Sequence, residues 1–146
     1  MDINDTLNEI LVKLFRNINA IEEQAVRSGE YKDMTTNDMH VIEAIGMDEA
    51  KNMSTVAKAL TVTTGTLTIS VNSLVKKGFV DRVRSEKDRR VVLISLTEKG
   101  KKAFCQHKKF HQDMIQAAVA QLNEEEKHVL QRALTDLNVF FRSWQK

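Results

Sequence analysis

The feature that most constrains this sequence is a β-hairpin pattern set between segments of helical pattern. Phe79–Arg84 alternates apolar and polar residues, and Val91–Leu96 is a run of β-forming residues. Between them lies a charged turn, S-E-K-D-R-R, at residues 85–90. Because alternation with a period of two is typical of strands, we expect one hairpin that carries the adjacent Arg89 and Arg90 at its tip.

Helical patterns lie on both sides of this hairpin. From Ile3 to about Arg27, apolar residues recur at three- and four-residue spacing, which predicts one long amphipathic helix. Further helices are predicted from an N-cap at Thr36 to Gly46, from an N-cap at Ser54 to near Thr61, from Gly65 to Gly78, from Thr97 to about Leu122, and, after an N-cap at Asn123, over Glu124–Trp144. The expected fold class is mainly α, an α+β fold with one hairpin.

The long terminal segments are more apolar than the small middle of the chain can cover. The last helix is expected to bury Val129, Leu130, Leu134, Leu137 and Phe141. A helical stripe that its own chain leaves uncovered normally meets a second copy of itself. We therefore infer a symmetric homodimer held by the two ends of the chain.

Composition excludes several classes of protein. Apolar residues make up 42% and charged residues 29%, which is typical of a globular chain. No run approaches the ~20 apolar residues of a membrane helix, and the acidic N-terminal segment lacks a signal-peptide pattern. The single cysteine, Cys105, excludes an internal disulfide, so we expect a cytoplasmic protein in which Cys105 is a small core residue. Without a glycine-rich phosphate loop or a nucleophile elbow, an enzyme is not expected.

Positive charge is concentrated in the middle of the chain, although the net charge is only +2. Lysines and arginines clearly outnumber acidic residues between Lys76 and Lys109. Such a local basic zone is typical of a surface that binds a polyanion. The alternative is a solvated lysine-rich face without a ligand.

The segments 54–60 and 65–77, joined by a short turn, have the proportions of a helix-turn-helix. In that motif the second helix enters the major groove of DNA. Hydroxyl side chains gather on the outward face of this helix, although β-branched residues lower helix propensity. The loss of helix propensity is understandable if the hydroxyl groups contact phosphates or base edges. The alternative is an ordinary polar helix face.

The hairpin tip is the second predicted DNA-contacting element. Arginines suit the negative potential of a narrow minor groove, and Asp88 can hold Arg90 by a bidentate pair. The predicted DNA-binding residues are Ser54, Thr63, Thr64, Gly65, Thr66, Thr68, Ser70, Asn72, Arg82, Arg84, Lys87, Asp88, Arg89 and Arg90.

Three segments, L-V-K-K-G-F-V-D-R (Leu74–Arg82), D-R-R (Asp88–Arg90) and L-T-E-K-G (Leu96–Gly100), resemble the MarR family of dimeric winged-helix transcriptional regulators. The resemblance implies a single domain over residues 1–146, with a winged helix-turn-helix at 36–97 and dimerisation helices at 1–30 and 98–146. It also implies that the helix led by Gly65 reads DNA while Arg90, oriented by Asp88, contacts the minor groove.

The chain departs from this family at one point. Many members carry an arginine in the middle of the recognition helix, where this chain has Thr68, Ile69 and Ser70. Base reading is therefore expected to depend on hydroxyls, Asn72 and DNA shape.

The segments 31–46, 61–74 and 107–114 resemble the fatty-acid-biosynthesis repressors, the FabT-type branch of the family. The implied function is a repressor of fatty-acid-biosynthesis genes that binds pseudo-palindromic double-stranded operator DNA. The implied co-repressor is acyl carrier protein with a long acyl chain, which needs an apolar cavity near the dimer-facing helices. Its candidate lining residues, which also fit an ordinary core, are Phe15, Ile18, Met39, Ile42, Phe104, Phe110 and Met114.

A metal site is the other candidate. His107 and His111 stand four residues apart on one predicted helix, a spacing that suits two zinc ligands but more often reflects surface or capping chemistry. Together with Glu22 and His40 they resemble the zinc-sensing branch of the family. That resemblance implies Glu22, His40, His107 and His111 as ligands, with Glu23 as an alternative to Glu22; the cysteine of that branch's second site is missing.

No cofactor is required for DNA binding, and a divalent metal such as zinc is the one candidate. The main expectation is a lipid-synthesis repressor. Its alternatives are a zinc-responsive repressor of metal uptake and a winged-helix adaptor for protein interactions.

Overall fold

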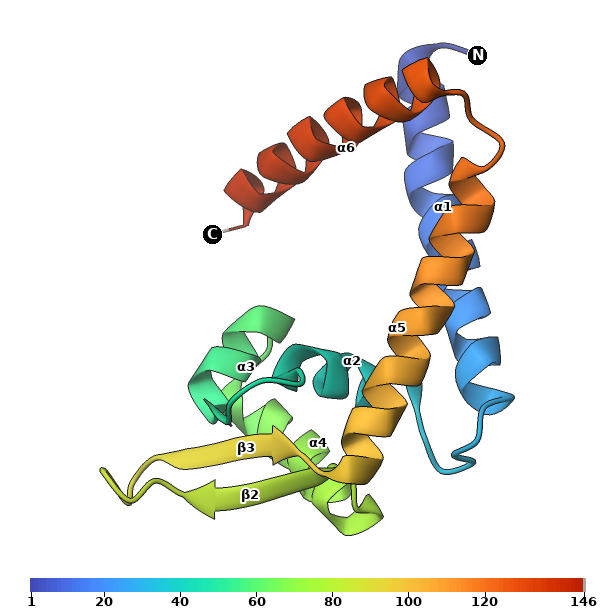
Figure 1. Cartoon of the computed structure of the whole chain (residues 1–146). Coiled ribbons are helices and arrows are strands. Elements are labelled where there is room, and N and C mark those ends of the chain that lie inside the picture. The colour runs from blue at the N-terminus through green and yellow to red at the C-terminus, as the bar shows by residue number, and fades with distance from the viewer. Residues whose placement is uncertain (146) are drawn as a thin grey trace. The chain divides into compact units, whose positions relative to one another are not determined.

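The structure, a computed structural model, describes residues 1–145, which form six helices and a three-stranded sheet. The helices are α1 (Ile3–Arg27), α2 (Thr36–Ile45), α3 (Met53–Leu60), α4 (Thr64–Lys77), α5 (Glu98–Val119) and α6 (Glu124–Trp144), and the strands are β1 (Lys51–Asn52), β2 (Val80–Arg84) and β3 (Val92–Leu96). This order confirms the predicted fold class (Figure 1). Only the two-residue strand β1 had no signal in the sequence pattern.

The chain divides into two compact units, Met1–His107 and Lys108–Lys146. The first contains α1 to α4, the sheet and the first half of α5, and the second contains the end of α5 and α6. Among the described residues, all that are buried lie in the first unit. None of the described helices combines the length and the apolar content that crossing a membrane requires.

The core of the first unit joins α2, α4 and the sheet. Its largest fully buried side chains are Phe79, Ile42, Ile45, Leu67, Leu74 and Ile94. Helices α2 and α4 each contribute one face at three- and four-residue spacing, as an amphipathic helix must. Burying each of these side chains contributes about 1.5–3 kcal/mol relative to exposure.

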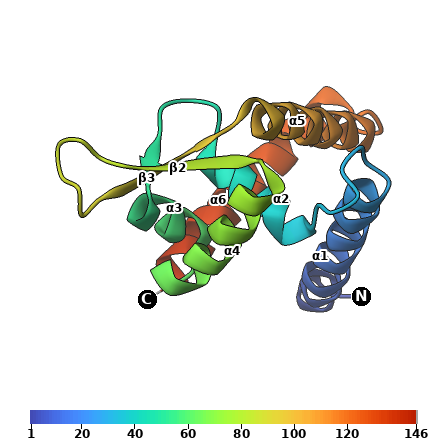
Figure 2. The ribbon, with the colours of Figure 1, turned by 90° about the horizontal axis from the view of Figure 1, so that it is seen from below.

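The sheet is antiparallel with the strand order β1-β3-β2. In the hairpin Val80 pairs with Leu96 and Arg84 pairs with Val92, which leaves residues 85–91 for the tip. Val80 is buried while the rest of β2 is exposed, so the base of the hairpin is anchored and its far end is solvated. Figures 1 and 2 show the hairpin extending away from α2 and α4.

Helix boundaries differ from the prediction where two capping residues compete. Thr35, rather than Thr36, caps α2, because its hydroxyl accepts the Asp38 N–H at 3.0 Å and the Asp38 carboxylate accepts the Thr35 N–H at 3.1 Å. Asn52, rather than Ser54, caps α3, and its side-chain oxygen accepts the Thr55 N–H at 2.8 Å. Helix α5 begins one residue after Thr97 and ends at Val119, before the predicted Leu122.

Two burial predictions are wrong for the single chain. Cys105 is exposed rather than part of the core, because it lies two residues beyond the buried Ala103 and so on another face of α5. Helix α6 buries none of its residues, and Val129, for example, is 60% exposed. The apolar residues of α6 are therefore exposed in this structure.

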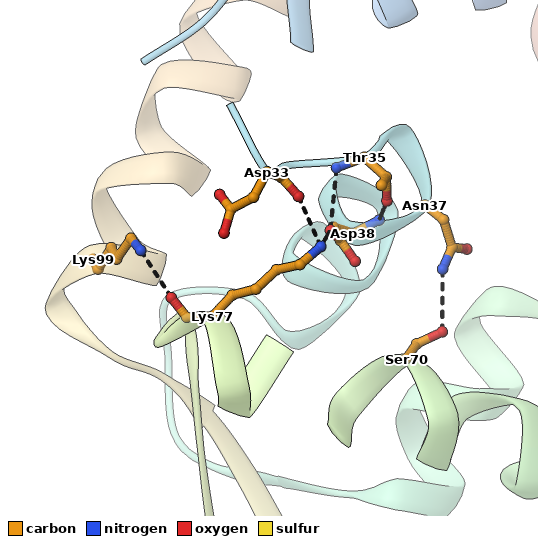
Figure 3. Close-up of polar contacts among 7 residues, drawn as sticks. All are labelled: Asp33, Thr35, Asn37, Asp38, Ser70, Lys77 and Lys99. Carbon is orange, nitrogen blue, oxygen red and sulfur yellow. Dashed lines mark hydrogen bonds and ion pairs between the residues drawn. The ribbon is translucent and has the colours of Figure 1, made fainter. Parts of the chain in front are cut away.

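Lys77 connects the end of α4 to α2 and α5, as Figure 3 shows. Its ammonium group donates to the Asp38 carboxylate and to the Asp33 carbonyl, both at 2.7 Å. Its carbonyl in turn accepts a hydrogen bond from Lys99 Nζ at 2.8 Å. Since Asp38 is only 4% exposed, this ion pair compensates a carboxylate whose burial is otherwise costly.

The junction between the hairpin and α5 requires glycine at position 100. The Thr97 N–H donates to the Phe79 carbonyl at 3.1 Å, and the Thr97 hydroxyl donates to the Gly78 carbonyl at 2.6 Å. The same hydroxyl oxygen accepts the Gly100 N–H at 3.1 Å, as an N-cap does. A Cβ at Gly100 would lie 2.1 Å from the Phe79 carbonyl oxygen, so the L-T-E-K-G sequence has a steric basis.

We expect Gly100→Ala to lower the free energy of unfolding by about 1–3 kcal/mol, because the added methyl group overpacks this junction. Urea denaturation followed by circular dichroism measures the change. Gly65→Ala is the matched control, since a Cβ there would meet only Thr63 Oγ1 at 4.0 Å. Its stability should change by less than about 1 kcal/mol, in the stabilising direction. Equal stability of the two variants would contradict the steric argument.

Candidate nucleic-acid interface

Helices α3 and α4 are joined by a very short turn. Helix α3 ends at Leu60 and is capped by Thr61, which takes the left-handed conformation with φ 56°. The Val62 N–H donates to the Ala57 carbonyl at 3.0 Å. Thr63 then caps α4 by accepting the Thr66 N–H at 3.1 Å. Only Val62 separates the two caps, so the turn fixes α4 closely against α3, as the predicted helix-turn-helix requires.

The predicted recognition residues lie on α4 or at its start, but several of their hydroxyl groups already have partners. The Thr68 hydroxyl donates to the Thr64 carbonyl at 2.8 Å, and the Thr63 hydroxyl donates to Thr66 Oγ1 at 2.9 Å. Ser70 Oγ accepts a hydrogen bond from Asn37 Nδ2 at 3.1 Å (Figure 3). These oxygens keep lone pairs that can accept from a ligand, but the hydroxyl hydrogens of Thr63 and Thr68 already form hydrogen bonds within the protein.

The hairpin tip contains the predicted bidentate pair. Arg90 Nε donates to Asp88 Oδ1 and Arg90 Nη2 donates to Asp88 Oδ2, both at 3.0 Å. The Arg90 N–H adds a third bond to Asp88 Oδ1 at 3.1 Å, while the Arg90 side chain remains 91% exposed. The guanidinium group and this backbone N–H hold the pKa of Asp88 below its ordinary value, and the carboxylate raises the pKa of Arg90. The tip therefore presents a guanidinium group in a fixed orientation to solvent.

Two further arginines connect the hairpin to its surroundings, a role that sequence reasoning did not assign to them. Arg84 Nη1 donates to the Arg89 carbonyl at 2.9 Å and so ties strand β2 to the tip. Arg82 Nη1 donates to Asn72 Oδ1 and so ties β2 to α4. The other predicted contacts, Ser54 on α3 and Lys87 and Arg89 at the tip, are exposed. Helices α3 and α4 and the hairpin thus carry all the predicted DNA-binding residues within one unit.

Three of the predicted metal ligands lie in the first unit. Glu22 is buried, and His40 Nε2 lies 3.5 Å from Glu22 Oε2. Glu22 and His107 offer ligand atoms within 4.8 Å of one another. Glu23, the alternative ligand, pairs instead with Arg27 on the exposed side of α1. The fourth residue, His111, lies one turn beyond His107 on α5, in the second unit.

Carboxylate and imidazole groups are ligands that zinc accepts. Around one tetrahedral zinc ion, ligand atoms stand about 3.3 Å apart, given bonds of about 2.0–2.1 Å. The separation between Glu22 and His40 therefore fits such an ion. His107 Nε2 also lies 3.8 Å from the Glu43 carboxylate, so this imidazole has an acidic neighbour in the protein itself.

The predicted effector residues occupy different environments. Met39 and Ile42 are buried in the core and Phe104 packs against it, whereas Phe15 is exposed and Ile18 half-buried on α1. Phe110 and Met114 are half-buried in the second unit. One small cavity in the first unit, of about 110 Å³, lies between α2, α3 and α4, and none of these residues lines it. Core packing explains the positions of Met39 and Ile42.

The chain is similar to known regulators over nearly its whole length. Residues 27–107 match the family described as "Transcriptional regulator SarA/Rot". The crystal structure of Streptococcus pneumoniae FabT in complex with DNA is 40% identical and has a TM-score of 0.93, over 97% of this chain and 99% of that chain. A MarR family transcription regulator has a TM-score of 0.83 at 15% identity, over 97% of this chain and 93% of that chain, which shows the shared fold alone.

SarZ, a helix-turn-helix transcriptional regulator of Staphylococcus aureus, is 42% identical over 69 residues. That match spans about half of each protein, 47% of this chain and 47% of SarZ. These relatives are transcriptional regulators and not enzymes. With its helix-turn-helix and its arginine-tipped hairpin, the chain belongs to the SarA/Rot family of transcriptional regulators and is a DNA-binding winged-helix protein of the MarR type.

Proposed function

We propose that this protein is a homodimeric repressor of fatty-acid-biosynthesis genes that binds pseudo-palindromic operator DNA. The observation that carries this proposal is the 40% identity to S. pneumoniae FabT, whose structure is a complex with DNA, over nearly the full length of both chains. The oriented Arg90 guanidinium group beside a helix-turn-helix supplies independent physical support.

In this proposal α4 enters the major groove and the hairpin tip enters the neighbouring minor groove. A guanidinium group carries five N–H donors, of which the pair with Asp88 uses two. The remaining donors can reach the acceptors on the groove floor, and a narrow minor groove attracts the positive charge. Asp88 reduces the net charge of the tip but holds the guanidinium group in the orientation that the groove requires.

The uncovered apolar surface of the terminal helices supports a homodimer. Phe15 and Leu14 of α1 are exposed, as are Leu134, Phe140 and Trp144 of α6. Extensive exposed apolar surface is typical of protein–protein contact sites, and a second copy can cover these side chains. A twofold dimer places its two recognition helices about one turn of DNA apart, roughly 34 Å, which makes the operator a pseudo-palindrome.

We further propose long-chain acyl carrier protein as the co-repressor, on the resemblance to the fatty-acid-biosynthesis repressors. Of the candidate lining residues in the first unit, Phe15 and Ile18 are accessible on α1. Met39 and Ile42 fill the core, so a long acyl chain could reach them only if the core opened. The accessible side of α1 is therefore the part of the candidate set that supports acyl binding.

The second candidate function is zinc-responsive repression. It is favoured by the approach of His40 and His107 to the buried Glu22 carboxylate. Bound zinc would neutralise this carboxylate and fix α1 to α2, since Glu22 lies on α1 and His40 lies on α2. Such a link would change the position of the reading helices, and without zinc the same groups form a partly buried polar cluster.

We expect Arg90→Ala to weaken operator binding by about 1–3 kcal/mol at fixed salt, because the minor-groove contact is lost. Fluorescence anisotropy measures the affinity, and sedimentation checks that the dimer is unchanged. Asp88→Asn should cost less, since the amide oxygen can still accept from the guanidinium group. Arg16→Ala removes the same charge from the exposed side of α1 and serves as the control. If Arg90→Ala and Arg16→Ala bind equally well, Arg90 does not contact DNA.

Operator affinity of metal-free protein, measured with acyl carrier protein or with zinc, separates the two effectors. The lipid proposal predicts tighter binding with the long-chain acylated carrier and no change with the unacylated carrier. Tightening by zinc alone, abolished in His40→Ala, would replace the lipid proposal by the zinc-responsive one. His40 suits this test because it is exposed, so its removal leaves the core intact.

A further inference from the structure

Ile69 lies at the centre of the outer face of α4. The buried residues of this helix are Leu67, Val71 and Leu74. Ile69 is two residues from both Leu67 and Val71, which places it on the opposite side of the helix, and it is 73% exposed. An exposed isoleucine gains little from packing within the chain, and its branched side chain lowers helix propensity. The fold therefore gives no reason for an isoleucine at this position.

The surroundings of Ile69 leave space for a partner. Gly65 lies one turn earlier on the same face, and a Cβ there would meet only Thr63 Oγ1, at 4.0 Å. Gly65 also lacks the positive φ that Gly46 and Gly78 adopt, so neither sterics nor backbone conformation demands a glycine. A helix position without a side chain is typical of a close backbone approach to a ligand. Gly65 and Ile69 together form a shallow apolar step on α4.

Two polar side chains beside this step already form hydrogen bonds within the protein. Thr68 uses its hydroxyl hydrogen on the Thr64 carbonyl, and Asn72 uses its side-chain oxygen to accept from Arg82. The step therefore offers aliphatic carbon where a recognition helix usually offers hydrogen bonds. In the major groove, the apolar group on the base edges is the C5-methyl of thymine.

We propose that Ile69 reads thymine methyl groups in each operator half-site, with Gly65 allowing the close approach. The inference rests on the proposed placement of α4 in the major groove. It adds a residue that determines sequence preference, because a methyl contact distinguishes thymine from cytosine and from the purines. It also accounts for base reading by a helix that has no arginine at its centre.

The test uses deoxyuridine, which keeps the hydrogen-bonding edge of thymine and lacks the methyl group. The full-length protein first selects a duplex from a random-sequence library, and each thymine of that duplex is then replaced singly. We expect the affinity to fall about fourfold at one or more positions in each half-site, which corresponds to about 0.8 kcal/mol for one buried methyl. Ile69→Ala should bind the thymine and deoxyuridine duplexes equally well.

Val83→Ala is the matched control, because Val83 is an aliphatic side chain on β2 that is 59% exposed. This variant should keep the full sensitivity to deoxyuridine. The proposal is overturned if the unmodified protein is insensitive at every thymine, or if Ile69→Ala keeps the same sensitivity at the same positions. Failure of the library to yield any preferred sequence would instead contradict sequence-specific reading as a whole. Circular dichroism and sedimentation confirm that each variant folds and associates normally.

Discussion

The close approach of α5 to the Phe79 carbonyl is the contact on which the geometry of the DNA-binding unit depends. Gly78 ends α4 with φ 87°, and Phe79 leads directly into β2, so the recognition helix and the hairpin meet at this point. Thr97 bonds to the carbonyls of both residues, and Gly100 leaves room for the contact. One junction therefore fixes the directions of α4, the hairpin and the first half of α5 together.

Aromatic and cationic contacts reinforce this junction. Tyr31 packs edge-on against the buried Phe79 ring with centroids 5.1 Å apart, and Lys99 Nζ lies 4.3 Å from the centre of the same ring. Lys99 also donates to the carbonyl of Lys77, whose ammonium pairs with Asp38. Movement of α5 relative to α4 would break several of these contacts at once. A signal that moves α5 would therefore change the position of the reading elements, which is how an effector could act on DNA affinity.

At the hairpin tip, Asp88 lowers the net positive charge but orients the guanidinium group of Arg90. A free arginine would bring more net charge to DNA but would lose side-chain entropy on binding. The carboxylate of Asp88 removes part of that charge and orders the guanidinium group before DNA arrives. Arg84 and Arg82 extend the same arrangement by tying the strand to the tip and to α4. Such ordering before binding lowers the entropic cost of association.

Much of this arrangement could be predicted from the sequence. Long periodic segments located α1 at Ile3–Arg27 and α6 at Glu124–Trp144, and the i,i+2 spacing in the turn predicted the Asp88–Arg90 pair. The sequence pattern did not predict which of two nearby polar residues caps a helix: Asn52, rather than Ser54, caps α3. Contacts between residues distant in sequence, such as that between Asn37 and Ser70, leave no periodic signal. The sequence therefore did not predict that hydroxyl groups of the recognition helix have hydrogen-bond partners within the protein. The sequence pattern also predicted burial of the apolar stripe of α6, whereas the structure leaves this helix exposed.

The most direct test of the central claim is a hydroxyl-radical footprint of the operator with and without the Arg90 side chain. Two copies that read DNA with α4 and the hairpin predict protected windows arranged symmetrically about a centre, with recognition helices one helical turn apart. The outer minor-groove protection should disappear selectively with Arg90→Ala while the major-groove contacts persist. A single asymmetric window, or a footprint identical in the two proteins, would contradict this account.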